Sequence, residues 1–222
     1  MRNNNGEKRG ELSNGIYSKL KEMICSGALK PNETLNLHGL TKIFNTSVTP
    51  VNSALSMLSE EGLVIKRPNK SAIVASMSVE EVKNVWLTGA LLEGMASYLA
   101  TSRITSDEIM AMEEVTRSMD DLRIPYDIGK LKELNQRFHR FYLRACGNKE
   151  LLELIRESSL KLYRYYILAA SLQGAVTDFV TQHTSIIENL KRRDPKGTRE
   201  AVEEHIISEG EKVIRCLEVG IE

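Results

Sequence analysis

A β-hairpin pattern occurs in one short stretch of the chain, and its confinement there is the strongest limit on the fold. The run from Leu63 to Val74, LVIKRPNKSAIV, holds two β-rich pieces around a Pro-Asn turn, which predicts a hairpin. Beyond Ser78 no such signal recurs, so the rest of the chain is expected to be helical. The fold class is therefore predicted to be mainly α.

Three short helices are predicted before the hairpin. Apolar residues recur at helical spacing from Ile16 to Cys25, and a second helix of barely two turns is expected around Leu40–Phe44. The third helix is predicted to begin with Thr49 as its N-cap and Pro50 at its first position. Three helices followed by a hairpin with a basic tip are typical of a winged helix-turn-helix, although a purely structural three-helix bundle has the same order.

The remainder of the chain is expected to form an antiparallel bundle. Amphipathic segments with plausible breaks between them are read near 79–103, 106–122, 126–145, 148–171, 174–192 and 195–218. These six segments predict an all-helical second domain.

Length and charge agree with two domains. The 222 residues exceed one typical domain, and 41% apolar with 27% charged residues indicate a globular chain. Residues 1–75 carry ten Lys and Arg against six Asp and Glu, whereas residues 76–222 carry twenty against twenty-four. A basic module joined to an acidic one suits a protein whose first part meets phosphate, although ordinary surface scatter gives the same surplus. We expect a disordered tail over 1–14, a DNA-binding domain over 15–75 and a helical domain over 76–222.

The cysteines and the apolar runs bear on the cellular location of the protein. Cys25, Cys146 and Cys216 lie far apart and show no CxxC spacing, so neither a disulfide framework nor a thiolate metal site is predicted. No signal-peptide core and no membrane-spanning run is evident. A cytoplasmic protein without a membrane partner is expected.

Two stretches of the chain resemble one known family. The N-terminal stretch is SGALKPNETLNLHGLTKIFNTSVTPVNSALSMLSEEGLVIKRPNKSAIV, and the C-terminal stretches are FHRFYLRACGNKELLEL and QHTSIIENLKRRDPKGTREAVEEH. Together they resemble the GntR family of bacterial regulators, specifically its FadR-type branch with an FCD domain in the shorter, six-helix, VanR-like form. The resemblance implies a homodimeric transcription regulator, such as a repressor, whose second domain senses a small carboxylate.

Several positions of the presumed DNA-binding surface depart from the family pattern. Arginines of that pattern are here His38, Val48 and Asn52, and the usual wing-tip glycine is Ser71. Arginines at such positions bind phosphate or read guanine, so direct readout must differ. The residues predicted to contact double-stranded DNA are His38, Thr46, Ser47, Thr49, Asn52, Lys66, Arg67 and Lys70.

Three of the four histidines lie in the second domain. His139, His183 and His205 are on different predicted helices, each on the side that carries the apolar residues. Converging imidazoles can bind zinc or nickel, but lone histidines on helices more often satisfy a local hydrogen bond. The resemblance favours a divalent metal site, because FCD domains place an Asp four residues before the first His. Here that position is Asn135, a neutral and weaker ligand.

The resemblance also bears on the effector. Family members often carry an Arg four residues before the Glu that corresponds to Glu93, and that position is Gly89 here. The anchor of the acid is therefore expected to be the metal, or a group such as Arg137, Arg164 or the Tyr142 hydroxyl.

Two other functions fit parts of the pattern. A metal held by three His also suits a hydrolytic or oxygenase enzyme, but no general base, nucleophile elbow or phosphate loop accompanies it. A regulator with a degenerate sensor would act constitutively.

Overall fold

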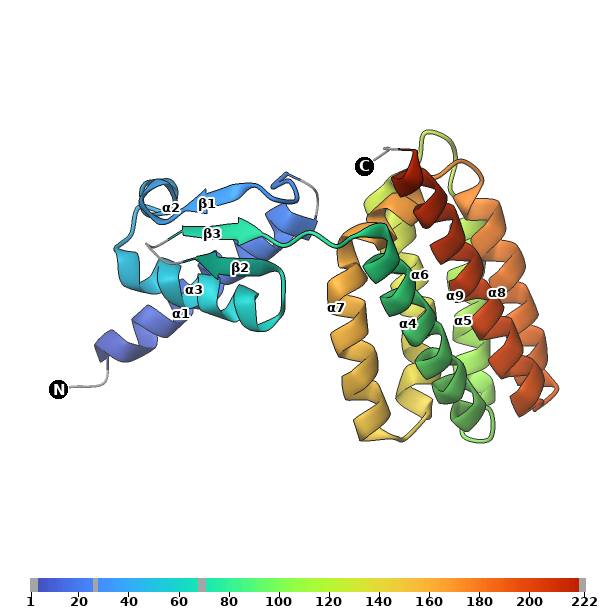
Figure 1. Cartoon of the computed structure of the whole chain (residues 1–222). Helices are drawn as coiled ribbons and strands as arrows, with labels where there is room; N and C mark the ends of the chain where they lie inside the picture. The colour runs from blue at the N-terminus through green and yellow to red at the C-terminus, as the bar shows by residue number, and fades with distance from the viewer. Residues whose placement is uncertain (1–3, 26–27, 68–70, 220–222) are drawn as a thin grey trace. The chain divides into compact units, whose positions relative to one another are not determined.

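The computed structural model describes residues 4–25, 28–67 and 71–219 and divides into two compact units, Met1–Met77 and Ser78–Glu222. The first unit contains α1 (Asn4–Cys25), β1 (Thr34–Asn36), α2 (Leu37–Ile43), α3 (Val48–Glu60), β2 (Val64–Arg67) and β3 (Ser71–Val74) (Figure 1). The second contains α4 (Val79–Ala100), α5 (Ser106–Asp120), α6 (Ile128–Ala145), α7 (Lys149–Ser171), α8 (Ala175–Lys191) and α9 (Pro195–Glu218).

The first unit is a winged helix-turn-helix, as predicted. Its strands form an antiparallel sheet in the order β1-β3-β2, and Val64 is paired with Val74 across the hairpin. Leu20 of α1 and Leu58 of α3 are fully buried, so the helices share one core with the inner face of the sheet. Gly62 ends α3 with a φ of 71°, a conformation that glycine adopts without steric cost.

Local structure in this unit differs from the sequence-based expectation at three places. Helix α1 already begins at Asn4, within the tail expected to be disordered, because its charged residues are good helix formers. Helix α2 begins at Leu37, since the Asn36 side chain accepts hydrogen bonds from two backbone N–H groups of its first turn. The N-cap of α3 is Ser47 rather than Thr49, and Pro50 is accommodated in the first turn.

The second unit is a bundle of long helices, and their capping residues explain where most of them begin. Ser78 and Thr105 each form a reciprocal capping box, with Glu81 and Glu108 respectively. Asp194 caps α9, whose first residue is Pro195. The fold class predicted from the sequence, a winged helix-turn-helix followed by a helical bundle, is confirmed.

Close packing of α4 against α9 forms the centre of the bundle. Trp86 of α4 is 1% exposed, and its indole Nε1 donates a hydrogen bond to the Ile206 carbonyl oxygen at 2.7 Å. The indole lies directly over Gly210, where an added Cβ would come within 2.6 Å of Trp86 Cδ1. A residue without a side chain is therefore needed at position 210.

Two further expectations concern the thiols and the membrane. Cys146 and Cys216 are free cysteines, and the Cys25 side chain lies outside the described residues. Across the helices that the structure describes, none combines the length and apolar composition needed to cross a bilayer.

Candidate functional site

Three histidines from three helices converge inside the bundle. His139 lies on α6, His183 on α8 and His205 on α9, and one ring nitrogen of each lies within 4.8 Å of the others. The Nε2 atoms of His139 and His205 are 3.1 Å apart. Because His183 and His205 are completely buried, bulk water does not satisfy their nitrogens.

Two of the imidazoles are oriented by neighbouring oxygen atoms. His139 Nδ1 is 2.8 Å from Glu93 Oε2, and His205 Nδ1 is 2.7 Å from Gln182 Oε1. Carboxylate and amide oxygens accept hydrogen bonds, so both rings carry a proton on Nδ1, and their Nε2 atoms face each other in the cluster. The Tyr142 hydroxyl donates to the same Glu93 oxygen at 2.6 Å. Such partners are typical of histidines that bind a metal ion.

His183 has no hydrogen-bond partner for either ring nitrogen. Its ring stacks on Phe138 with centroids 3.6 Å apart and planes 3° from parallel. The Asn135 side-chain oxygen, on the same helix as His139, is also buried and unpartnered. Buried polar atoms without partners are costly, so these atoms fit a site completed by a cation.

The protonation states of two of the three histidines suit a cation as well. Burial lowers the pKa of His183 and of His205 well below the usual value; the charges of His205 and His139 lower that of His183 further, and the charge of His139 lowers that of His205. Burial also opposes the charged form of His139, but the carboxylates of Glu93 and Glu209 together outweigh burial and raise that pKa, so a bound cation would displace a proton from His139. Neutral imidazoles with free lone pairs are the form that binds zinc or nickel.

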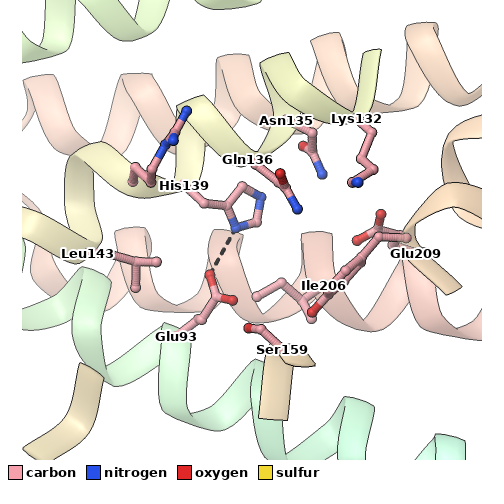
Figure 2. A pocket seen from close by; sticks show the side chains of 11 residues that line it. Glu93, Lys132, Asn135, Gln136, His139, Leu143, Ser159, Ile206 and Glu209 are labelled. Atoms are coloured by element: carbon pink, nitrogen blue, oxygen red, sulfur yellow. Dashed lines mark hydrogen bonds and ion pairs between the residues drawn. The ribbon is translucent and has the colours of Figure 1, made fainter. Parts of the chain in front are cut away.

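A cavity of about 240 Å³ adjoins the histidine cluster. Figure 2 shows His139, Gln136, Asn135 and Lys132 of α6 together with Glu209 of α9 in its lining. The other lining residues are Glu93, Arg140, Leu143, Ser159, Tyr166 and Ile206.

Glu209 is the unexpected member of this lining. It is 5% exposed, and its Oε1 atom has no hydrogen-bond partner. Burial raises its pKa to about 7, against the lowering effect of His139 and with a further rise from Glu93. Its spacing of one helical turn after His205 was a signal that sequence reasoning missed.

The residues expected to anchor an effector are not brought together. Tyr142 is fully buried behind His139 and does not line the cavity. Arg137 lies on the exposed face of α6 beside Arg140 and Arg144, because its position turns it away from the bundle. The Arg164 side chain lies outside the described residues.

The residues expected to meet DNA lie on α2, on α3, between these helices and on the hairpin. Exposed side chains are those of His38, Ser47, Thr49, Asn52, Lys66 and Arg67, and Thr46 is half-buried. Lys66 Nζ donates to Ser56 Oγ at 2.9 Å, which ties β2 to α3. Val48, where the family pattern has an Arg, is 41% exposed. Lys70 lies outside the described residues.

Comparison with known proteins matches both units. Residues 12–74 match the sequence model described as bacterial regulatory proteins, gntR family, and residues 88–208 match the FCD domain. A Bacillus subtilis protein described as the uncharacterized HTH-type transcriptional regulator YdhC is 23% identical over 208 residues, covering 93% of each chain.

Other relatives include named repressors. The Escherichia coli HTH-type transcriptional repressor GlaR is 26% identical over 206 residues, covering 86% of this chain and 91% of its own. The solved structure of Escherichia coli McbR/YncC is similar in fold, with a TM-score of 0.76 and 19% identity over 93% of this chain and 98% of that one.

Proposed function

The chain belongs to the GntR family of bacterial regulatory proteins and carries an FCD domain, and we propose that a metal ion and a small organic acid control its binding to operator DNA. It is a transcription regulator of this type, as its relatives are, and not an enzyme. The observation that carries the proposal is the pair of unpartnered His183 nitrogens at the meeting point of three imidazoles.

The donor set supports a divalent cation. His139, His183 and His205 supply nitrogen atoms, and the Asn135 oxygen is a fourth, neutral donor. Zinc and nickel both accept imidazole ligands and leave positions open. The amide is a weaker ligand than the family's carboxylate, so we expect the bound anion to contribute more to metal retention.

The adjoining cavity supports the organic acid. At about 240 Å³ it fits a small molecule rather than a drug-sized one. A cation bound by the histidines supplies Lewis acidity and positive charge for a carboxylate. Binding of the acid then shifts the regulator toward a state that does not fit its DNA.

The exposed face of α3 supports recognition of DNA, with altered sequence preference. Asn52 is exposed there, and an Asn amide pairs with adenine in the major groove. Because positions 48 and 52 are not arginines, we expect other groups, such as Arg67, to contact the phosphates. We expect an operator that differs from those of relatives with the arginines.

A homodimer is supported by an apolar stripe on α4. Leu87, Leu91, Met95 and Tyr98 are all more than a third exposed, and their spacing places them along one face of the helix. Pairing this stripe with its copy would remove it from water in both subunits. Two recognition helices then meet half-sites about 34 Å apart. Because GlaR and another relative, RspR, are named repressors, we expect repression.

A gel-shift titration tests the proposal. The zinc-loaded protein is expected to bind the duplex upstream of its own gene at low salt, and one member of a panel of small organic acids should weaken binding at least about fivefold. His183→Leu should bind the same duplex but not respond to the acid. No binding to this duplex or to random duplexes would refute DNA recognition. Binding that neither zinc nor any acid changes would indicate a constitutive regulator and refute the sensor.

A further inference from the structure

Glu209 presents a carboxylate to the cavity without a protein partner for its Oε1 atom. The residue lies on α9, one helical turn beyond His205, and is 5% exposed. Its Oε1 is buried and makes no hydrogen bond. The same residue lines the cavity that adjoins His139. The Oε1 atom is thus inaccessible to bulk water, and the side chain that carries it borders the space that a ligand would fill.

Lys132 of α6 and Lys212 of α9 both lie near Glu209, but neither donates a hydrogen bond to its Oε1 atom. Lys212 follows Glu209 on α9, but its ammonium is 2.5 Å from Asp178 Oδ2 and is thereby paired. Glu93 is a second carboxylate in the lining and adds repulsion. A buried carboxylate oxygen without a partner is costly, and the raised pKa of Glu209 agrees with that cost.

The cavity therefore offers one site for an anionic group and one for a cationic hydrogen-bond donor. The histidine cluster, once it holds a cation, attracts an anionic group, whereas Glu209 attracts a hydrogen-bond donor with positive charge. Ammonium groups form stronger hydrogen bonds with carboxylates than hydroxyl groups do. A ligand with a carboxylate and a protonated amine satisfies both sides within about 240 Å³.

We propose, on the basis of the function proposed above, that the effector is a small amino acid whose carboxylate lies at the histidine cluster and whose ammonium group binds Glu209 Oε1. Glu209 is then the residue that selects an amino acid over the corresponding hydroxy acid or unsubstituted acid.

Matched sets of acids test this selectivity. Isothermal titration of the zinc-loaded full chain compares alanine, lactate and propionate; aspartate, malate and succinate; and glutamate, 2-hydroxyglutarate and glutarate. The amino member of the set that fits should bind at least about tenfold more tightly than the other two. Glu209→Gln should abolish this preference and leave the affinity for the unsubstituted acid and the zinc content unchanged. Glu204→Gln, an exposed change on the same helix, is the matched control and should behave as wild type.

Other outcomes overturn the inference in distinguishable ways. If a hydroxy or unsubstituted acid binds as tightly as its amino counterpart, Glu209 selects no amine and the inference fails, while the proposed response to acids stands. If Glu209→Gln loses zinc, Glu209 is a metal ligand. If zinc-loaded wild type binds none of the nine acids, both the inference and the proposed response to acids fail. Should Glu209→Gln not fold, the three sets of acids measured on wild type still show whether the amino acid is preferred.

Discussion

His183 illustrates how one buried side chain carries information about function. Its ring is stacked on Phe138 and sealed from water, yet neither nitrogen has a partner. A histidine that served only the core would satisfy at least one nitrogen, as His205 does with Gln182.

The sequence predicted part of this arrangement. Helical spacing placed His139, His183 and His205 on the apolar side of their helices. Glu93 and Gln182 were not predictable as their partners, because those contacts depend on which helices pack together. Glu209 was within reach of the spacing argument, since it follows His205 by one turn.

Replacing His183 should have opposite effects without and with metal. In metal-free protein, His183→Leu removes two unsatisfied buried nitrogens, so the free energy of unfolding should rise by about 1–3 kcal/mol. Zinc should stabilise wild type but no longer the variant. Urea unfolding with and without zinc measures the metal-free stability and the stabilisation by zinc. His38→Leu, at an exposed position, is the control. Metal-free destabilisation by His183→Leu would instead indicate a packing role.

The difference in stability between wild type and His183→Leu should depend on pH, and the sign of this dependence follows from the pKa of His183. The pKa of His183 in the folded chain lies well below its ordinary value of 6.5, so the unfolded chain takes up the proton first as the pH falls. Metal-free wild type should therefore lose stability, relative to His183→Leu, as the pH is lowered through about 6.5. Unfolding curves between pH 5 and about pH 8 check this. A constant difference between the two proteins would show that His183 titrates normally.

Among the structural elements, helix boundaries in the second unit followed from local signals. The amphipathic segments expected from residues 79, 106 and 195 begin where Ser78, Thr105 and Asp194 cap α4, α5 and α9. Boundaries in the first unit were less predictable, because Asn36 and Ser47 compete with neighbouring residues of similar capping strength. Contacts between helices, such as that of Trp86 with Gly210, cannot be predicted from the local sequence, because the residues that meet are far apart in the chain.

Two glycines should respond to alanine with opposite signs. Gly210→Ala places a Cβ within 2.6 Å of the Trp86 indole and should cost about 1–3 kcal/mol, because α4 and α9 must separate. Gly89→Ala, within α4, meets no atom within 4 Å and should stabilise the protein by about 0.5–1 kcal/mol. Urea unfolding compares the two variants. Equal effects of both would contradict the close packing of α4 on α9.

At the scale of the whole molecule, a basic winged helix-turn-helix unit is joined to an acidic helical unit. The sequence indicated this division through its charge asymmetry and through the loss of β signal after Ser78. The apolar stripe on α4 was not identified, because the apolar residues of this helix fall on both its buried and its exposed faces.

A charge on the α4 stripe should separate the proposed dimer. Leu91→Glu introduces a carboxylate at a position that is 57% exposed, so the fold should persist while light scattering reports a monomer with weaker DNA binding. Leu154→Glu, at a residue on α7 that is 51% exposed, is the matched control and should remain dimeric. A dimer that survives Leu91→Glu would place the interface elsewhere.

We propose that the three histidines hold a metal ion through which an organic acid controls DNA binding. Elemental analysis of purified protein tests it most directly. About one zinc or nickel ion per chain is predicted for wild type and for His38→Leu, and none for His183→Leu. Wild type without stoichiometric metal after incubation with either ion, or His183→Leu with as much metal as wild type, would contradict the account.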